Sequence, residues 1–271
     1  MFNALKIGQD FWQACSLGAS GKVHSVFERA INIEVSEDGR LLTLLCEDGD
    51  IMPANCTTCT PDGLWKSFAK VGDKVLFTPD IVYIDNIARI NRIANAEPWK
   101  QLSAEAIAAI GKPAYTDILA LGNVVEKYLT KKAGKDCLSP NYALALLNPL
   151  NFIGLGAGLT PAGDDFLAGM LHSLHFMEKL YGKRPCYLLE NTQIIAENLH
   201  RTGTISRHFL RYALNGEWGQ STENFFVSLV KGKQKELYDA VDVKLSYGAS
   251  SGADELRGCL FAIKETLKDY Q

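Results

Sequence analysis

The spacing of apolar residues changes once along the chain, close to Ala96. Before this point they form short runs, many of them β-branched, separated by turn residues. The runs, between Val23 and Ile93, are VHSVF, AINIEV, LLTLLC, KVLFT, IVYI and ARINRI. The dipeptide Asp38-Gly39 between two of them indicates a tight hairpin, because such turns need positive φ angles. The pattern predicts about six strands in a small antiparallel β-barrel or sandwich.

Beyond Glu97-Pro98 the apolar residues recur at a spacing near 3.6, which is typical of amphipathic helices. The predicted helices are Ala104–Ile110, Thr116–Lys132, Asn141–Leu147, Pro161–Leu180, Gln193–His200, Arg207–Leu214, Thr222–Val230, Lys233–Val243 and Gly252–Tyr270. We therefore predict an α+β protein with a β-rich domain over residues 1–96 and a helical domain over residues 97–271.

Composition narrows the possible partners. The net charge is -3 and the basic residues are dispersed, so nucleic acid is not an expected partner. No apolar run approaches the roughly 20 residues that span a bilayer, and the first residues lack the features of a secretory signal. We expect a cytoplasmic protein without a membrane partner. The seven cysteines are expected to be reduced, with Cys56 and Cys59 as two buried thiols near a strand rather than half of a zinc site.

The segment GLGAGLTPAGDD, residues 154–165, is rich in both glycine and acid. Thr160 as N-cap and Pro161 at the first helical position predict that a helix begins here. Free N–H groups and the positive end of the helix dipole make such a start a natural anion site. We interpret the glycines before it as positions where a ligand can approach the backbone closely: Gly154, Gly156 and Gly158.

Asp164 and Asp165 conflict with a simple phosphate site, because two carboxylates at the same helix start would repel an unneutralised anion. A bridging Mg²⁺ would resolve the conflict, since it takes one or two carboxylates together with phosphate oxygens. Both acids are thus candidate catalytic and metal-binding residues, and no organic cofactor is expected. The alternative also stands: the acids stabilise the helix dipole, and the glycines only shape a turn.

A second segment has a sequence similar to that of the first. SGADELRGCLFAI, residues 251–263, aligns with AGDDFLAGMLHSL, residues 162–174. Both carry a glycine within a predicted helix, Gly169 and Gly258, which costs about 1 kcal/mol relative to alanine and favours a close helix contact as the reason. We predict that the two helices touch through these glycines. Their N-termini would then lie side by side around one pocket, which also receives Ser250, Ser251 and Asp254. Coincidence remains the alternative.

Two further candidates follow Ser206, the predicted N-cap of another helix. Arg207 offers a rigid fork of donors that suits a carboxylate or phosphate. His208 is a candidate acid or base. The alternatives are a surface ion pair for Arg207 and a half-buried structural role for His208.

Four stretches together carry a family resemblance: SGKVHSVFERAINI (20–33), GLGAGLTPAGDDFLAG (154–169), SRHFLRYALNG (206–216) and the helix start at Ser250. They occur in the same order over most of the chain, which resembles a bacterial family that includes the AllH-type subunit of oxamate carbamoyltransferase, from anaerobic allantoin breakdown. The resemblance implies a role, with further subunits, in exchanging oxamate and carbamoyl phosphate with oxalurate and phosphate during purine degradation. It supplies no catalytic residues.

Two functions are consistent with these features. The chain is either an enzyme component that binds a small phosphorylated or carboxylated ligand at the glycine-rich helix start, or a structural or regulatory subunit that uses the same loop as a partner interface. A pocket at the loop would favour the first function, and an exposed apolar surface the second.

Overall fold

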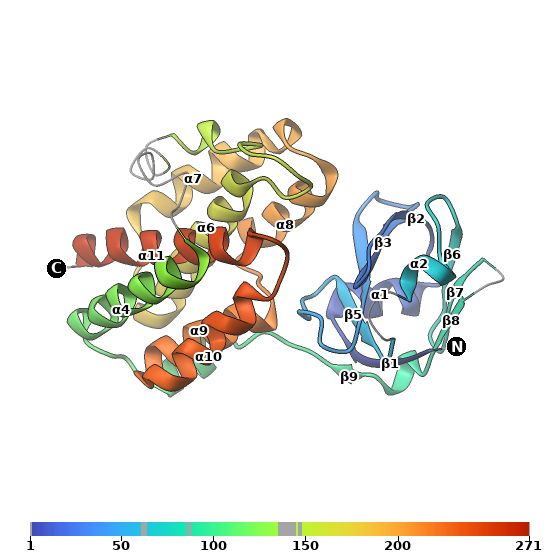
Figure 1. The fold of residues 1–271 in the computed structure, drawn as a ribbon, viewed down its shortest axis with the longest axis horizontal. Coiled ribbons are helices and arrows are strands. Elements are labelled where there is room, and N and C mark those ends of the chain that lie inside the picture. Colours follow the sequence, from blue (N-terminus) through green and yellow to red (C-terminus); the bar gives the residue numbers. More distant parts are fainter. Residues whose placement is uncertain (1, 61–63, 86–87, 135–144, 146–147, 271) are drawn as a thin grey trace. The chain divides into compact units, whose positions relative to one another are not determined.

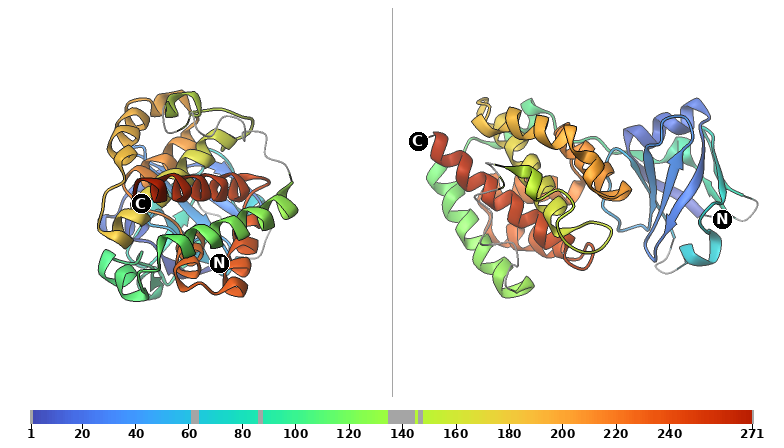
Figure 2. Two further views of the ribbon diagram at one scale, coloured as in Figure 1. Left: turned by 90° about the vertical axis from the view of Figure 1, so that its left-hand side faces the viewer. Right: turned by 90° about the horizontal axis from the view of Figure 1, so that it is seen from above.

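The computed structural model describes residues 2–60, 64–85, 88–134, 145 and 148–270 (Figures 1 and 2). The chain divides into two compact units, Met1–Gln101 and Leu102–Gln271; the sequence placed the boundary near Ala96. The first unit is built from strands and the second from helices, so the predicted α+β class is confirmed.

The N-terminal unit is a closed β-barrel. Its strands are β1 (Phe2–Ile7), β2 (Ser20–Val26), β3 (Ala30–Val35), β4 (Leu41–Leu45), β5 (Asn55–Thr58), β6 (Lys74–Phe77), β7 (Val82–Ile84), β8 (Ala88–Asn91) and β9 (Glu97–Pro98). In the described residues, the order β5-β4-β3-β2-β6-β7-β8-β1 closes because β1 also pairs with β5, and β9 adds to β1. Closure gives each of the strands β1 to β8 a partner on both sides.

The predicted hairpin is present. β3 and β4 pair antiparallel with Ile33 opposite Leu42, and Gly39 in the turn between them has a φ of 69°. Two neighbouring pairs in the barrel, β4–β5 and β1–β8, are instead parallel. The sequence analysis missed both β1 and β5, because FNALKI and NCTT lack the alternation that marks a strand.

Helix α1 (Gln9–Leu17) was also missed. It buries Phe11, Ala14 and Cys15 and contacts β4, β5 and β6. The ring of Phe11 meets that of Phe77 edge-on, with 5.5 Å between centroids. A short helix, α2 (Trp65–Phe68), adds a fully buried tryptophan.

The prediction of two buried thiols was wrong in one respect: Cys56 is buried in β5, whereas Cys59 is exposed.

The second unit is helical. Its helices are α3 (Ala104–Ile110), α4 (Tyr115–Ala133), α6 (Ala162–Tyr181), α7 (Cys186–Glu197), α8 (Thr204–Leu214), α9 (Gln220–Lys231), α10 (Gln234–Leu245) and α11 (Ser251–Tyr270). The predicted helix Asn141–Leu147 lies outside the described residues except for Ala145. Helix α7 begins earlier than predicted, and α8 begins at Thr204 with Gly203, not Ser206, as its N-cap. None of the described helices is both long and apolar enough to cross a membrane.

Helices α6 and α11 form the centre of this unit and share its most extensive contact. A Cβ atom added to Gly169 would lie 1.9 Å from the carbonyl oxygen of Glu255, and one added to Gly258 would lie 2.0 Å from that of Phe166. Phe166 and Glu255 occupy equivalent places in the two aligned segments, so the contact is locally two-fold symmetric. The predicted contact through Gly169 and Gly258 is confirmed.

We expect Gly169→Ala to destabilise the protein by roughly 1 to 3 kcal/mol or more, because the new methyl group meets backbone that cannot rotate away. Gly122→Ala in α4 is the matched control: its Cβ would meet only Leu260 Cδ2, at 3.9 Å. The control should be neutral or stabilising by up to about 1 kcal/mol, because alanine is the better helix former. Urea unfolding of both variants tests this; equal effects would contradict the backbone contact.

Candidate functional site

The backbone of the glycine-rich loop before α6 favours glycine at three positions, and at two of them there is also no space for a side chain. Gly154, Gly156 and Gly158 have φ angles of 75°, 123° and 94°, a region that favours glycine. A Cβ atom would lie 2.8 Å from Arg201 O at Gly154 and 2.8 Å from Ala162 N at Gly156. At Gly158 it would meet nothing within 4 Å. Only Gly158 therefore leaves space for close approach by another molecule.

Asp164 holds this loop in place. Its side chain is buried; Oδ1 accepts a hydrogen bond from the Gly154 N–H at 2.8 Å, and Oδ2 accepts one from the Thr202 hydroxyl. The carboxylate thus ties the loop to the segment before α8. Both of its oxygens are engaged by the protein.

Asp165 differs from its neighbour. It accepts a hydrogen bond from Ser251, but its Oδ2 is buried and has no hydrogen-bond partner among the described residues. Burial raises the pKa of Asp165 to about 8, helped by the nearby charges of Glu255, Asp254 and Asp164 and opposed by the Ser251 hydroxyl. The carboxyl group is therefore mostly protonated at pH 7, which reduces the repulsion expected from two adjacent acids.

The starts of α6 and α11 lie side by side, as the alignment predicted. The Thr160 and Ser251 hydroxyl oxygens are 2.8 Å apart. Thr160 is not the N-cap, because Pro161 takes that position and α6 begins at Ala162. Ser250 is exposed, and its carbonyl oxygen accepts a hydrogen bond of 3.0 Å from the backbone N–H of Asp254. Thr160, Asp165 and Ser251 thus lie together where the two helices begin, and Asp254 lies in the first turn of α11 with its side chain paired to Arg257.

The backbone donors at the start of α6 are largely engaged. The Gly163 N–H donates to Leu155 O at 2.8 Å, and the Asp164 N–H donates to Pro161 O at 2.9 Å. Any anion here would be held mainly by the two hydroxyls and the helix dipoles.

Arg207 and His208 both lie in the first part of α8, and Arg207 contacts Thr202, the residue that donates to Asp164. Arg207 donates from Nε to Leu199 O at 3.1 Å and from Nη2 to Thr202 O at 3.0 Å. His208 is buried, with its ring 4.8 Å from that of Tyr212. The contacts of Arg207 hold the turn before α8, whereas the ring contact of His208 lies within α8. Their chemical roles stay predictions.

The sequence analysis missed a buried ionic network beside Asp165. Glu255 pairs with Lys244 Nζ at 2.7 Å and with His172 Nδ1 at 3.2 Å, and accepts the Thr222 hydroxyl at 2.8 Å. Burial alone would raise the pKa of Glu255, but Lys244 and His172 outweigh it and hold the pKa well below its usual range. Glu255 thus stays negative next to Asp165. The sequence did show that Glu255 lies in the α11 segment that aligns with the start of α6. Nothing in the sequence links Lys244 to Glu255.

Two further observations bear on the choice between a ligand site and an interface. Among the described residues, no group of three or more His, Cys, Asp or Glu side chains is arranged to hold a metal ion. The glycine-rich loop exposes two leucines, Leu155 at 41% and Leu159 at 58%.

Fold and site define an α+β protein in which a closed β-barrel unit precedes a helical unit built on a glycine-mediated helix pair. Residues 152–263 match the family model described as oxamate carbamoyltransferase subunit AllH, and residues 3–97 match the AllH family N-terminal domain. The chain belongs to the AllH family. A search of the solved structures gave no significant match.

The raised pKa of Asp165 predicts a pH-dependent stability. Between pH 4 and pH 8 the folded chain keeps a proton that the unfolded chain, with a pKa near 3.8, has released. Stability conferred by this group therefore falls as pH rises through that window and levels off above pH 8. Asp165→Asn should remove this effect, so its stability relative to wild type should increase by up to about 1.4 kcal/mol per pH unit.

Urea unfolding at intervals from pH 4 to pH 9 measures the difference. Asp239→Asn, at an exposed position on α10, is the control and should track the wild type at every pH. Parallel curves for wild type and Asp165→Asn would show that Asp165 ionises normally.

Proposed function

We propose that this chain is a cytoplasmic subunit of an oxamate carbamoyltransferase and binds a small phosphorylated or carboxylated substrate where α6 and α11 begin. The reaction would exchange oxamate and carbamoyl phosphate with oxalurate and phosphate in the breakdown of purines through allantoin. The family match supports the subunit role. The meeting of two helix starts at the Thr160 and Ser251 hydroxyls is the observation that supports this location.

The residues at this point suit a small anion in three ways. Two parallel helix dipoles direct their positive ends at it. The hydroxyls of Thr160 and Ser251 can turn to donate hydrogen bonds to a phosphate or carboxylate oxygen. Gly158, which has open space beside it, lets a ligand approach the loop, and a protonated Asp165 adds a donor rather than a charge.

A magnesium ion would use the same residues differently. Asp164 already accepts hydrogen bonds at both oxygens, so the unpartnered Asp165 Oδ2 is the better protein ligand, with substrate oxygens completing the shell. Because Asp165 is mostly protonated at pH 7, metal binding would release a proton. Arg207 and His208 would act on the bound substrate from the N-terminal part of α8.

Calorimetric titration with carbamoyl phosphate, with and without Mg²⁺ and with partner subunits present, tests this site. Ser251→Ala should weaken binding about fivefold through the lost hydroxyl. Asp165→Asn should remove any dependence on Mg²⁺ and the proton release that accompanies it, while Asp239→Asn should behave as wild type. Equal binding by all variants, or no binding by any in the assembled enzyme, would exclude a substrate site here.

The exposed leucines of the loop favour a second function, that of a structural or regulatory subunit with the loop as its interface. Leu155 and Leu159 flank Gly156 and Gly158, so the loop presents two apolar side chains on a backbone fixed by Asp164. Isolated exposed leucines are common, but two on one anchored loop can be buried together by a partner.

The double variant Leu155→Ser/Leu159→Ser tests this function. If the loop is an interface, it should reduce co-purification with partner subunits at least tenfold, since each leucine loses about 1 kcal/mol or more of burial. Leu17→Ser, at a 72% exposed leucine of the N-terminal unit, is the control and should leave assembly intact. Normal assembly of the double variant would rule out the interface and leave the substrate site untouched.

A further inference from the structure

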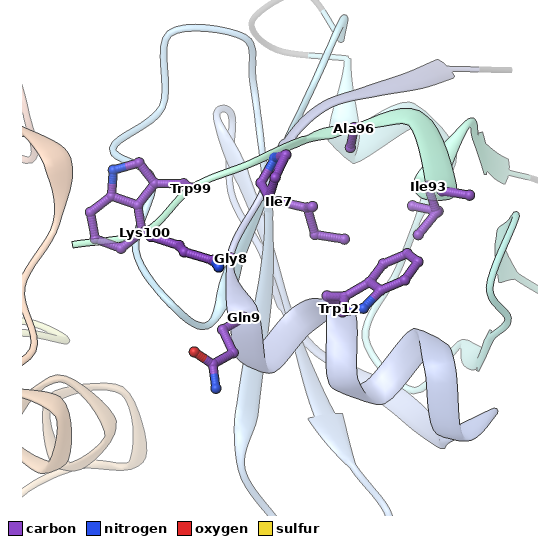
Figure 3. A pocket seen from close by; sticks show the side chains of 10 residues that line it. Ile7, Gly8, Gln9, Trp12, Ile93, Ala96, Trp99 and Lys100 are labelled. Atoms are coloured by element: carbon purple, nitrogen blue, oxygen red, sulfur yellow. The ribbon is translucent and has the colours of Figure 1, made fainter. Parts of the chain in front are cut away.

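A pocket of about 520 Å³ opens in the N-terminal unit, where β1 ends and α1 begins (Figure 3). Its walls also include the 3-10 turn Ile93–Asn95 and the chain from β9 to Lys100. The volume lies within the roughly 300 to 1,000 Å³ typical of small-molecule sites. The pocket and the α6–α11 site belong to different units, so an inference about the pocket does not depend on the proposed function.

The lining is mainly flat and apolar. Ile7, Ile93 and Pro98 contribute aliphatic surface, and Trp12 contributes its indole ring. The indole of Trp99 points away from Trp12 (Figure 3). The backbone N–H of Trp99 donates to Ile7 O at 2.9 Å, which fixes the chain at this wall of the pocket, and the residue is only 9% exposed. Trp12 is 38% exposed on α1. Indole rings bury large apolar areas and stack on planar groups, so this lining suits a flat, apolar ligand.

One charged residue, Lys100, lines the pocket. Its ammonium group forms no ion pair or hydrogen bond with any described residue, and its side chain extends toward Gly8 at the start of α1 (Figure 3). The N-terminus of a helix carries partial positive charge, so two positive groups approach one another there. Asp10 in the first turn is not among the lining residues. An acidic group on the ligand would relieve this repulsion.

We propose that this pocket binds a small aromatic carboxylate. Its ring lies against the indole of Trp12 and the aliphatic side chains beside it. Its carboxylate lies toward Lys100 and the first turn of α1, where Gln9 can donate a further hydrogen bond.

The tryptophan indole N–H signals in a proton–nitrogen correlation spectrum test the location, with benzoate as the probe. Trp12 and Trp99 line the pocket, whereas Trp65 and Trp218 are fully buried elsewhere. Benzoate should shift the Trp12 signal saturably and leave the signals of Trp65 and Trp218 unchanged; Trp12→Phe assigns the Trp12 signal. The absence of shifts up to the solubility limit of benzoate, or equal shifts of all four, would overturn the proposal.

Two matched comparisons test the chemistry. Lys100→Gln should weaken benzoate binding roughly threefold to fivefold and leave binding of neutral benzyl alcohol unchanged. Lys70→Gln removes one exposed charge from the same unit and should change neither. Trp12→Ala should reduce binding of both probes while the spectrum stays folded. Equal weakening of benzoate by Lys70→Gln and Lys100→Gln, or unchanged binding in Trp12→Ala, would contradict the proposed mode.

Discussion

The direct backbone contact between α6 and α11 at Gly169 and Gly258 determines how the helical unit is arranged. Each glycine leaves less than 2.1 Å between its missing Cβ and the facing carbonyl oxygen, so no other residue fits without moving a helix. This close approach brings the two helix starts together, with Thr160 against Ser251 and Asp165 beside both. A wider spacing would separate these groups and uncouple the glycine-rich loop from α11.

The same contact crowds acidic residues into the first turns of two adjacent helices, and the fold treats each acid differently. Asp164 is satisfied by hydrogen bonds from the loop and Thr202, and Asp254 by an ion pair with Arg257 at 2.7 Å. Glu255 is compensated by Lys244 and His172. Asp165 corresponds to Asp254 in the aligned segments, but Ala168 stands where α11 has Arg257. Asp165 therefore reduces its buried charge by holding a proton.

The N-terminal unit has to satisfy the exposed edges of its short strands. Its strands are short, and closure into a barrel pairs the edges that an open sheet would expose. Strand β1 makes the closure possible, because it pairs with β5 on one side and β8 on the other. The chain then passes from β1 into α1, and β9 returns beside β1, which places Trp12 and Trp99 around one pocket. Both units match models of the same family.

The sequence alone determined the features that depend on local conformation or on the likeness of two segments. The change from strand to helix spacing and the Asp38-Gly39 turn could be predicted, because each follows from the preferences of a few neighbouring residues. The contact at Gly169 and Gly258 could be predicted from the likeness of the two segments and from the cost of glycine within a helix. The tertiary structure decided the rest. β1 and β5 have weak local signals and are strands only because partners pair with them, and α1 went unrecognised although it buries Phe11. Which acid is charged, and that Lys244 compensates Glu255, depend on burial and on charges far apart in the chain, which no local pattern encodes.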